Sequence, residues 1–152
     1  MKEQRRGRRI AMSSDERDKY LRGQRTCRLA TVHAGRPHLS ALWFVWDGDA
    51  FWVTSIVKSQ RWTDIQREPH VSVLVDSGHG YGELCGVEIV GTAESVGEVP
   101  RVGEPNEELG VPEQLFADKY SGGTFHHDGR HAWLRIVPEK IVSWDFRKIP
   151  AG

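Results

Sequence analysis

The residues of this chain whose types and spacing could do chemistry form one short stretch: Lys58, Ser59, Gln60 and Arg61. They follow an apolar run, residues 51–56, at the point where a helical pattern begins. A helix start offers unpaired backbone N–H groups and the positive end of the helix dipole, so it favours an anion. Arginine adds a planar fork that suits phosphate oxygens, and lysine adds a mobile point charge. The stretch therefore predicts a phosphate-binding turn. Ordinary solvated turn charges are the alternative, because the motif is short.

The segments on either side of this turn position it. Residues 51–56 are β-branched and aromatic, which is typical of a largely buried strand. The helix that follows is expected to end at Glu68-Pro69, and residues 70–75 form the next strand. The stretch therefore has the order strand, cationic turn, short helix, strand.

The first fifty residues predict one helix and two strands. Ser13 followed by Glu16 fits a capping box for a short helix that ends near Gly23. Alternating apolar and polar residues predict a strand over 26–33, a turn over 34–37 and a second strand over 38–46. The sequence DGD at 47–49 is a hairpin turn into the strand 51–56.

The second half of the chain adds strands separated by loops. A long alternating strand is expected over 83–96, in which Gly86 and Gly91 indicate bulges or sharp bends. The predicted elements that follow are a loop over 100–112, a helix over 112–120, a loop over 121–130 and two strands over 131–137 and 141–146, divided by Pro138.

About six strands with hairpin turns and two or three short helices predict a mainly β fold, a small antiparallel β-barrel. Several strands, residues 43–46 most clearly, are apolar on both faces, so one face needs a helix or a second subunit to cover it. A twofold homodimer is the economical solution. Six tryptophans also suit an interface or an aromatic-walled pocket.

Length and charge limit the function classes. The chain has 152 residues, with 21 Lys plus Arg and 21 Asp plus Glu, which favours a single domain over residues 13–152 without bulk attraction to nucleic acid or to an anionic membrane. Residues 1–12 are expected to form a disordered basic tail; a nucleic-acid-binding arm is the alternative. No apolar run reaches membrane-spanning length and no signal peptide is recognisable, so we expect a cytoplasmic protein.

No protein-borne catalytic set is evident. Cys27 and Cys85 are isolated in apolar segments and predict buried free thiols. His126, His127 and His131, with Asp128, could bind a metal, but their spacing in a glycine-rich loop favours a surface loop, and no metal site is predicted. We assign no catalytic side chain. A cofactor held by the phosphate turn could carry the chemistry instead.

Several motifs together resemble the pyridoxamine 5'-phosphate oxidase-like family of split β-barrels that bind flavin or deazaflavin. These motifs are GRPHLS at 35–40, VTSIVKSQR at 53–61, EPHVSVLVD at 68–76, GYGELCGVEIVGTAE at 80–94 and VSWDFRK at 142–148. The resemblance implies a homodimeric split barrel with a cofactor held at the subunit interface. Ser59, Gln60 and Arg61, reinforced by Lys58, resemble the phosphate-binding turn of the family.

The resemblance also implies roles for four other residues. Thr54 and Ser55 would lie along the ribityl chain and the edge of the cofactor ring. His38 stands where family members place a polar residue that faces the ring. Tyr81 resembles an aromatic residue that the neighbouring subunit contributes. The alternatives are a hydrogen-bonded strand residue for His38 and a surface-packed loop residue for Tyr81.

The chain lacks the longer C-terminal substrate motif of true pyridoxamine phosphate oxidases, and its short SQR turn resembles the branch that uses coenzyme F420. The resemblance therefore implies an F420-dependent oxidoreductase that transfers a hydride between the deazaflavin and a small electron-poor substrate, with solvent or His38 supplying a proton. FMN is the alternative cofactor. A non-catalytic flavin- or haem-binding protein, with His33, His38 or His70 as a haem ligand, is a further alternative.

Overall fold

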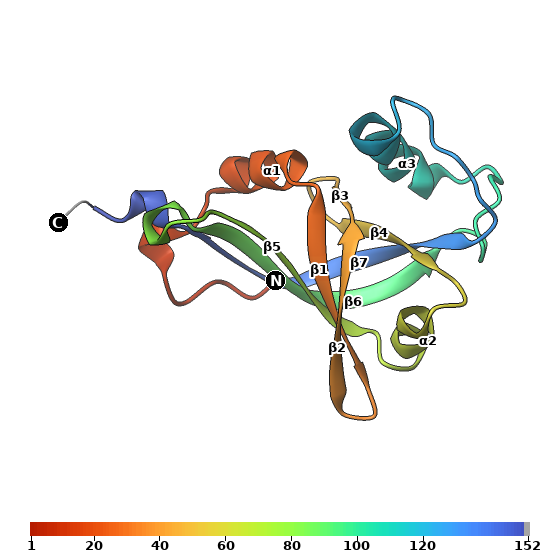
Figure 1. Cartoon of the computed structure of the whole chain (residues 1–152), viewed down its shortest axis with the longest axis horizontal. Helices are drawn as coiled ribbons and strands as arrows, with labels where there is room; N and C mark the ends of the chain where they lie inside the picture. Colours follow the sequence, from red (N-terminus) through yellow and green to blue (C-terminus); the bar gives the residue numbers. More distant parts are fainter. Residues whose placement is uncertain (151–152) are drawn as a thin grey trace.

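The computed structural model describes residues 1–150 as a strongly curled, seven-stranded antiparallel sheet with three α-helices (Figure 1). The strand order is β2-β1-β5-β6-β7-β4-β3, so β2 and β3 are the two ends of the sheet. The strands are β1 (Thr26–His33), β2 (Arg36–Trp43), β3 (Val45–Trp46), β4 (Phe51–Ile56), β5 (His70–Ser77), β6 (Cys85–Val96) and β7 (His131–Asp145). The curl matches a split barrel, which confirms the predicted mainly β fold; the dimer stays a prediction.

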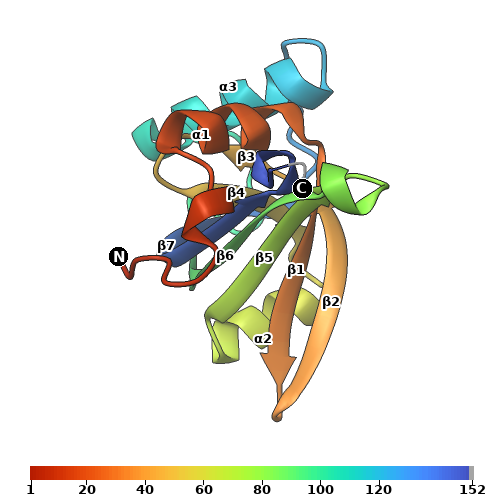
Figure 2. The ribbon, with the colours of Figure 1, turned by 90° about the vertical axis from the view of Figure 1, so that its left-hand side faces the viewer.

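Three α-helices and three short 3-10 turns complete the chain: α1 (Ser14–Gly23), α2 (Gln60–Arg67), α3 (Glu107–Tyr120), η1 (Arg8–Ile10), η2 (Tyr81–Glu83) and η3 (Phe146–Lys148). Helices α1 and α3 cover the end of the sheet where β3 and β4 lie, and α2 lies near the far end of the β1–β2 hairpin (Figures 1 and 2).

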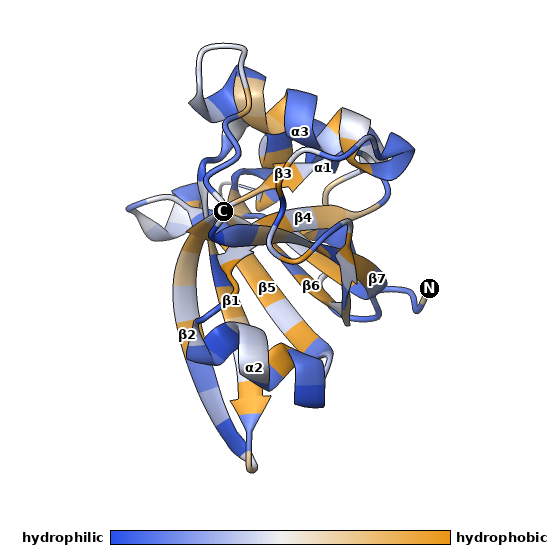
Figure 3. Cartoon of the chain, turned by 90° about the vertical axis from the view of Figure 1, so that its right-hand side faces the viewer, coloured by the Kyte–Doolittle hydropathy of each residue, from blue (hydrophilic) through white to orange (hydrophobic). Residues whose placement is uncertain are grey.

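The concave side of the sheet holds the main core. On β1, Cys27, Leu29 and Thr31 are buried while Arg28 and Val32 face outward, which confirms the predicted alternation. The largest fully buried side chains of this core are Leu21, Leu29, Phe44, Trp46, Phe51, Ile89, Leu134 and Ile136. The apolar stripes on the strands are visible in Figure 3.

A second apolar cluster lies on the opposite face of β4, under α3. It contains Trp52 and Trp133, whose rings meet edge to face at 6.1 Å, together with Val45 and Leu109. Strand β4 is therefore covered on both faces, which explains why its sequence is almost continuously apolar.

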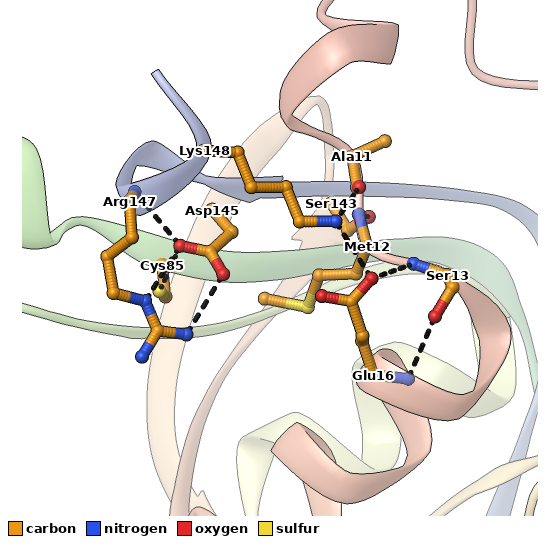
Figure 4. Close-up of polar contacts among 9 residues, drawn as sticks. All are labelled: Ala11, Met12, Ser13, Glu16, Cys85, Ser143, Asp145, Arg147 and Lys148. Carbon is orange, nitrogen blue, oxygen red and sulfur yellow. Dashed lines mark hydrogen bonds and ion pairs between the residues drawn. The ribbon is translucent and has the colours of Figure 1, made fainter. Parts of the chain in front are cut away.

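The segment before α1 contacts β7 and the turn that follows it; Figure 4 shows the contacts of residues 11–16. The capping box is confirmed, because the Glu16 amide donates to Ser13 Oγ and the Ser13 amide donates to Glu16 Oε1. Ahead of the helix, the Met12 amide donates to Ser143 Oγ at 2.8 Å, and the Gln4 side chain bonds both the N–H and the C=O of Ser143. The segment expected to be a disordered tail thus contacts a stretch of β7 that lies beyond its pairing with β4.

The prediction of one strand over 38–46 is wrong. The strand is divided at Phe44, whose N–H donates to the Tyr120 hydroxyl and whose C=O accepts from it, at 3.1 and 2.9 Å. Because α3 satisfies this backbone, the chain can leave β2 and start β3. The preceding turn is also tighter than predicted, since only Ala34 and Gly35 lie outside the strands, both at positive φ.

The predicted division of the last strand at Pro138 is also wrong. Strand β7 continues through Pro138, which stands opposite Gly91 of β6. The pairing shifts by one residue between Val90 and Gly91, so the missing proline N–H falls at a bulge. A Cβ on Gly91 would lie 2.3 Å from the Val137 carbonyl oxygen, which is why glycine stands there.

Helix α3 begins earlier than predicted. The sequence analysis places its start at residue 112, but the helix runs from Glu107 and carries Pro112 inside it. Asn106 caps the helix, because its side chain accepts from the Glu108 amide at 2.9 Å. Because proline is favoured near the start of a helix, the pattern places the start at Pro112. The signal for the observed start is the capping residue Asn106.

Candidate functional site

Ser59 fixes the cationic turn. Its hydroxyl donates to the Ile56 carbonyl at 2.7 Å and accepts from the Trp62 amide at 3.1 Å, so it caps α2 and ties the helix start to the end of β4. The predicted order of strand, turn, helix and strand is confirmed, with the helix over Gln60–Arg67 and the next strand starting at His70.

Arg61 lies half-buried beside this cap. Its Nε donates to Ser55 Oγ at 3.1 Å, and Ser55 is fully buried. Burial lowers the pKa of Arg61, because it penalises the charged guanidinium. Within residues 1–150, neither terminal nitrogen of Arg61 makes a hydrogen bond or an ion pair. The guanidinium is thus oriented by Ser55 and has two donors available for an anion.

Lys58 and Gln60 differ in whether their side chains bind another residue of the chain. Lys58 is exposed on the turn and makes no ion pair with any residue of the described chain 1–150. Gln60 donates from its side-chain amide to Asp64 Oδ1 at 2.7 Å, so it is directed back along the helix. Ser55, Ser59 and Arg61 are therefore the predicted residues that the structure brings together, with Ser55 and Ser59 hydroxyls 3.4 Å apart.

Thr54 belongs to the opposite face of β4. Successive side chains of a strand alternate, so Thr54 faces away from Ser55 and pairs with Trp133 of β7. There it lines a cavity of about 480 Å³. The two residues predicted to contact one cofactor thus lie on two sides of the same strand, at adjacent positions.

His38 and Tyr81 are not brought to the turn within one chain. His38 is exposed on β2, opposite Thr31, and does not line the cavity. Tyr81 is 75% exposed and contacts Phe146 edge to face. All eight residues of β5 separate α2 from the loop before Tyr81, a span of about 25 Å. A role for Tyr81 at the turn therefore requires a second subunit.

The cavity that Thr54 lines is walled by aromatic rings from four segments: Trp43, Phe116, Phe125 and Trp133. Phe125 stacks on Trp133, with centroids 5.5 Å apart, and Phe116 meets Trp133 edge to face at 5.9 Å. Its polar lining residues are Thr26, Thr54, Arg101, His126, His127, Asp128 and His131. The loop 121–130, which the sequence analysis interprets as a surface loop, forms part of this lining.

Arg101 lines the cavity, and two carboxylates balance its positive charge. It is 6% exposed and forms ion pairs with Glu98 at 2.6 Å and with Glu113 at 2.8 Å. Burial opposes ionisation of Glu98, but the hydrogen bonds from Arg101 and the Glu104 amide outweigh it and lower the pKa of Glu98 to about 2. This cluster joins α3 to the loop before it and leaves no net positive charge there.

Two of the histidines considered as haem ligands, His33 and His70, lie beside a carboxylate. His33 Nδ1 lies 3.3 Å from the buried Asp64, and His70 Nδ1 lies 2.5 Å from Glu68. Across residues 1–150, no group of three or more His, Cys, Asp or Glu is arranged to hold a metal ion.

The helices within residues 1–150 are too short or too polar to cross a membrane.

The fold is a curled split barrel with a half-buried arginine at the turn after β4. The model of the pyridoxamine 5'-phosphate oxidase family matches residues 13–145. The chain belongs to this family. No protein of curated function matches it significantly.

Several solved structures share this fold. The conserved hypothetical protein Rv2991 of Mycobacterium tuberculosis is 31% identical, with a TM-score of 0.80 over 98% of this chain and 96% of that one. A protein named F420 reductase is 23% identical, with a TM-score of 0.61 over 82% and 94% of the two chains. The haem-storage protein HutZ of Vibrio cholerae is 18% identical, with a TM-score of 0.65 over 85% and 93%. The last two comparisons show the fold alone.

Proposed function

We propose that this protein is an F420-dependent oxidoreductase that transfers a hydride between the deazaflavin and a small electron-poor substrate. The observation that carries the proposal is the half-buried Arg61, which Ser55 orients and whose two terminal nitrogens have no partner within residues 1–150. Such a group fits the phosphate of a flavin-type cofactor. The similarity in fold to an F420 reductase and the short SQR turn support F420.

The chain's own residues would hold the cofactor and exclude water. Arg61 and the backbone N–H groups after Ser59 would bind the phosphate, with Lys58 adding charge from the exposed side. The cavity beside Thr54, of about 480 Å³ and walled by aromatic rings, would accommodate a planar ring system or a flat substrate. When bound, a reduced deazaflavin supplies a hydride; the protein orients it and keeps the reacting atoms in an apolar site.

The test of this proposal is cofactor titration of wild type and of Arg61→Ala, with F420, FMN and haemin compared by tryptophan fluorescence. We expect the wild type to bind F420 more tightly than FMN. Arg61→Ala should weaken binding about 10- to 100-fold, because it removes charge-assisted hydrogen bonds worth about 1.4–2.8 kcal/mol. Arg61→Lys should retain part of the affinity, since it keeps the charge and loses the fork.

Arg67→Ala is the matched control, because Arg67 is an exposed arginine on the same helix. Equal cofactor affinity in wild type and Arg61→Ala would overturn the assignment of the phosphate site. A preference for FMN would move the protein to the flavin branch of the family with the site unchanged. Tight haemin binding without F420 or FMN binding would support the non-catalytic alternative.

A further inference from the structure

An oriented histidine lies in the lining of the aromatic cavity. His131 Nδ1 is 2.5 Å from Asp128 Oδ2, while Asp128 Oδ1 accepts from the amides of Arg130 and His131 at 2.9 and 3.1 Å. These backbone bonds fix the carboxylate, and the carboxylate accepts from Nδ1–H and so fixes the orientation of the imidazole; in the imidazolium form the second proton is on Nε2, which is then the donor. Nε2 makes no hydrogen bond within residues 1–150.

Strand pairing connects His131 to the cationic turn. His131 stands directly opposite Ile56, the last residue of β4, and the Val57 amide donates to the Arg130 carbonyl at 2.9 Å. Thr54 and His131 both line the cavity. The histidine is therefore held by the same strand end from which the proposed phosphate turn begins, and its position relative to that turn is fixed by backbone bonds.

The other charged and imidazole groups of the lining either contact a carboxylate already or have no hydrogen-bond partner among residues 1–150 that would orient them. Arg101 is paired with Glu98 and Glu113, and His127 Nε2 lies 3.6 Å from Glu113. His126 makes no hydrogen bond within the described residues 1–150. Among the charged and imidazole groups of the lining, His131 is thus the one that is both oriented and available to a ligand; the hydroxyls of Thr26 and Thr54 also line the cavity. An apolar aromatic wall with one such donor selects a flat molecule with one acceptor oxygen.

We propose that the imidazolium form of His131, held by Asp128 through Nδ1–H, is the hydrogen-bond and proton donor to the carbonyl oxygen of a planar conjugated carbonyl compound that lies against this aromatic wall. The proton transfer rests on the proposed function, which supplies the reductant. The acceptor's β-carbon gains a hydride from the reduced deazaflavin or flavin, which is oxidised by two electrons. The carbonyl oxygen gains the proton from Nε2, and the resulting enol tautomerises to the saturated ketone. Solvent then returns a proton to His131.

Ligand binding to the cofactor-free protein tests the first part. The probes are benzylideneacetone, a planar enone, and trans-β-methylstyrene, which has a similar shape without the carbonyl group. In NMR titrations, His131→Phe should raise the Kd of benzylideneacetone about 5- to 10-fold, the loss of one hydrogen bond, because phenylalanine keeps a ring and has no donor. The Kd of trans-β-methylstyrene should not rise, and His126→Phe should leave the ratio of the two values unchanged. An equal response of both probes to His131→Phe, or the absence of binding, would overturn the proposal.

Reduction of benzylideneacetone tests the proton transfer. His131→Gln should slow single-turnover reduction about 100-fold, as expected for loss of a general acid, while the cofactor Kd stays at the wild-type value. Added imidazole should restore part of the rate to His131→Ala, which loss of a purely structural side chain would not allow. Asp128→Asn should lower the rate less, because Asp128 is a positioning residue. A wild-type rate in His131→Gln would refute the role as proton donor.

The two proposals fail in different ways. If cofactor binding is present and depends on Arg61, but the enone does not bind or does not respond to His131, the oxidoreductase proposal stands and the role of His131 is wrong. If the enone binds through His131 in a protein that binds neither F420 nor FMN, the cavity assignment stands and the oxidoreductase proposal is wrong.

Discussion

Asp145 is a nearly buried carboxylate whose charge is stabilised by Arg147 and, more weakly, by the Cys85 thiol. The hydrogen bonds from Arg147 lower the pKa of Asp145 from 3.8 to about 2, against the penalty of burial. Because the folded-state pKa lies below the unfolded value, the stabilisation is complete above about 3.8 and is lost as the pH falls towards 2. We expect the free energy of unfolding to decrease over this interval, measured by urea denaturation at a series of pH values.

Replacing Asp145 by Asn should remove this part of the pH dependence and lower the stability at neutral pH. Asp49→Asn is the control, because Asp49 is exposed in the hairpin turn and its carboxylate makes no hydrogen bond within residues 1–150. The same acid-induced loss in Asp145→Asn and wild type would show that other carboxylates cause it, with Glu98 the first candidate since its pKa is also about 2.

At the level of single residues, the sequence predicts contacts that are local in the chain. Ser59 and Arg61 act within six residues of their partners, so a turn motif is sufficient to identify them. The aromatic cavity combines Trp43, Phe116 and Trp133, which strand pairing and the packing of α3 bring together across ninety positions. The histidine-rich loop 121–130 gives no signal that it will line such a cavity, so the sequence analysis considers His131 only as a metal ligand.

Strand β7 continues through a proline, a residue that normally interrupts a strand, at the position where its partner β6 has a glycine. The extra residue of the bulge is Glu139 of β7, next to Pro138, and the missing Cβ of Gly91 on β6 leaves room for the Val137 carbonyl. Gly91→Ala would place a methyl group 2.3 Å from that oxygen, so the backbone of the central ladder must move. We expect a loss of about 2–3 kcal/mol in the free energy of unfolding, measured by chemical denaturation.

For Gly110→Ala in helix α3 we expect the opposite effect on stability. Gly110 is exposed in α3, and a Cβ there would have no heavy atom within 4 Å. Alanine should raise the free energy of unfolding by about 0.5–1 kcal/mol, because it restricts the unfolded chain and favours the helix. Equal effects of the two substitutions would mean that the bulge tolerates a side chain and that the β6–β7 pairing is not what places glycine at position 91.

On the scale of the whole molecule, the curled sheet ends in a strand that has no partner on one side within residues 1–150. Strand β2 is the terminal strand, and the apolar side chains Leu39 and Trp43 are 75% and 50% exposed, with Val32 of β1 nearby at 37%. Monomeric proteins rarely leave such an edge open, because an apolar edge strand associates with other chains. The predicted homodimer would cover it.

We therefore expect the wild-type protein to sediment as a dimer at micromolar concentration and Leu39→Glu to sediment as a monomer, because a buried charge without a partner opposes association. Val102→Glu is the matched control, since Val102 is 59% exposed in the loop before α3. Cofactor affinity should fall in Leu39→Glu together with the dimer, because Tyr81 can reach the turn only from a second copy. Unchanged affinity in a monomeric Leu39→Glu would show that one chain forms the complete site and that Tyr81 has no part in it.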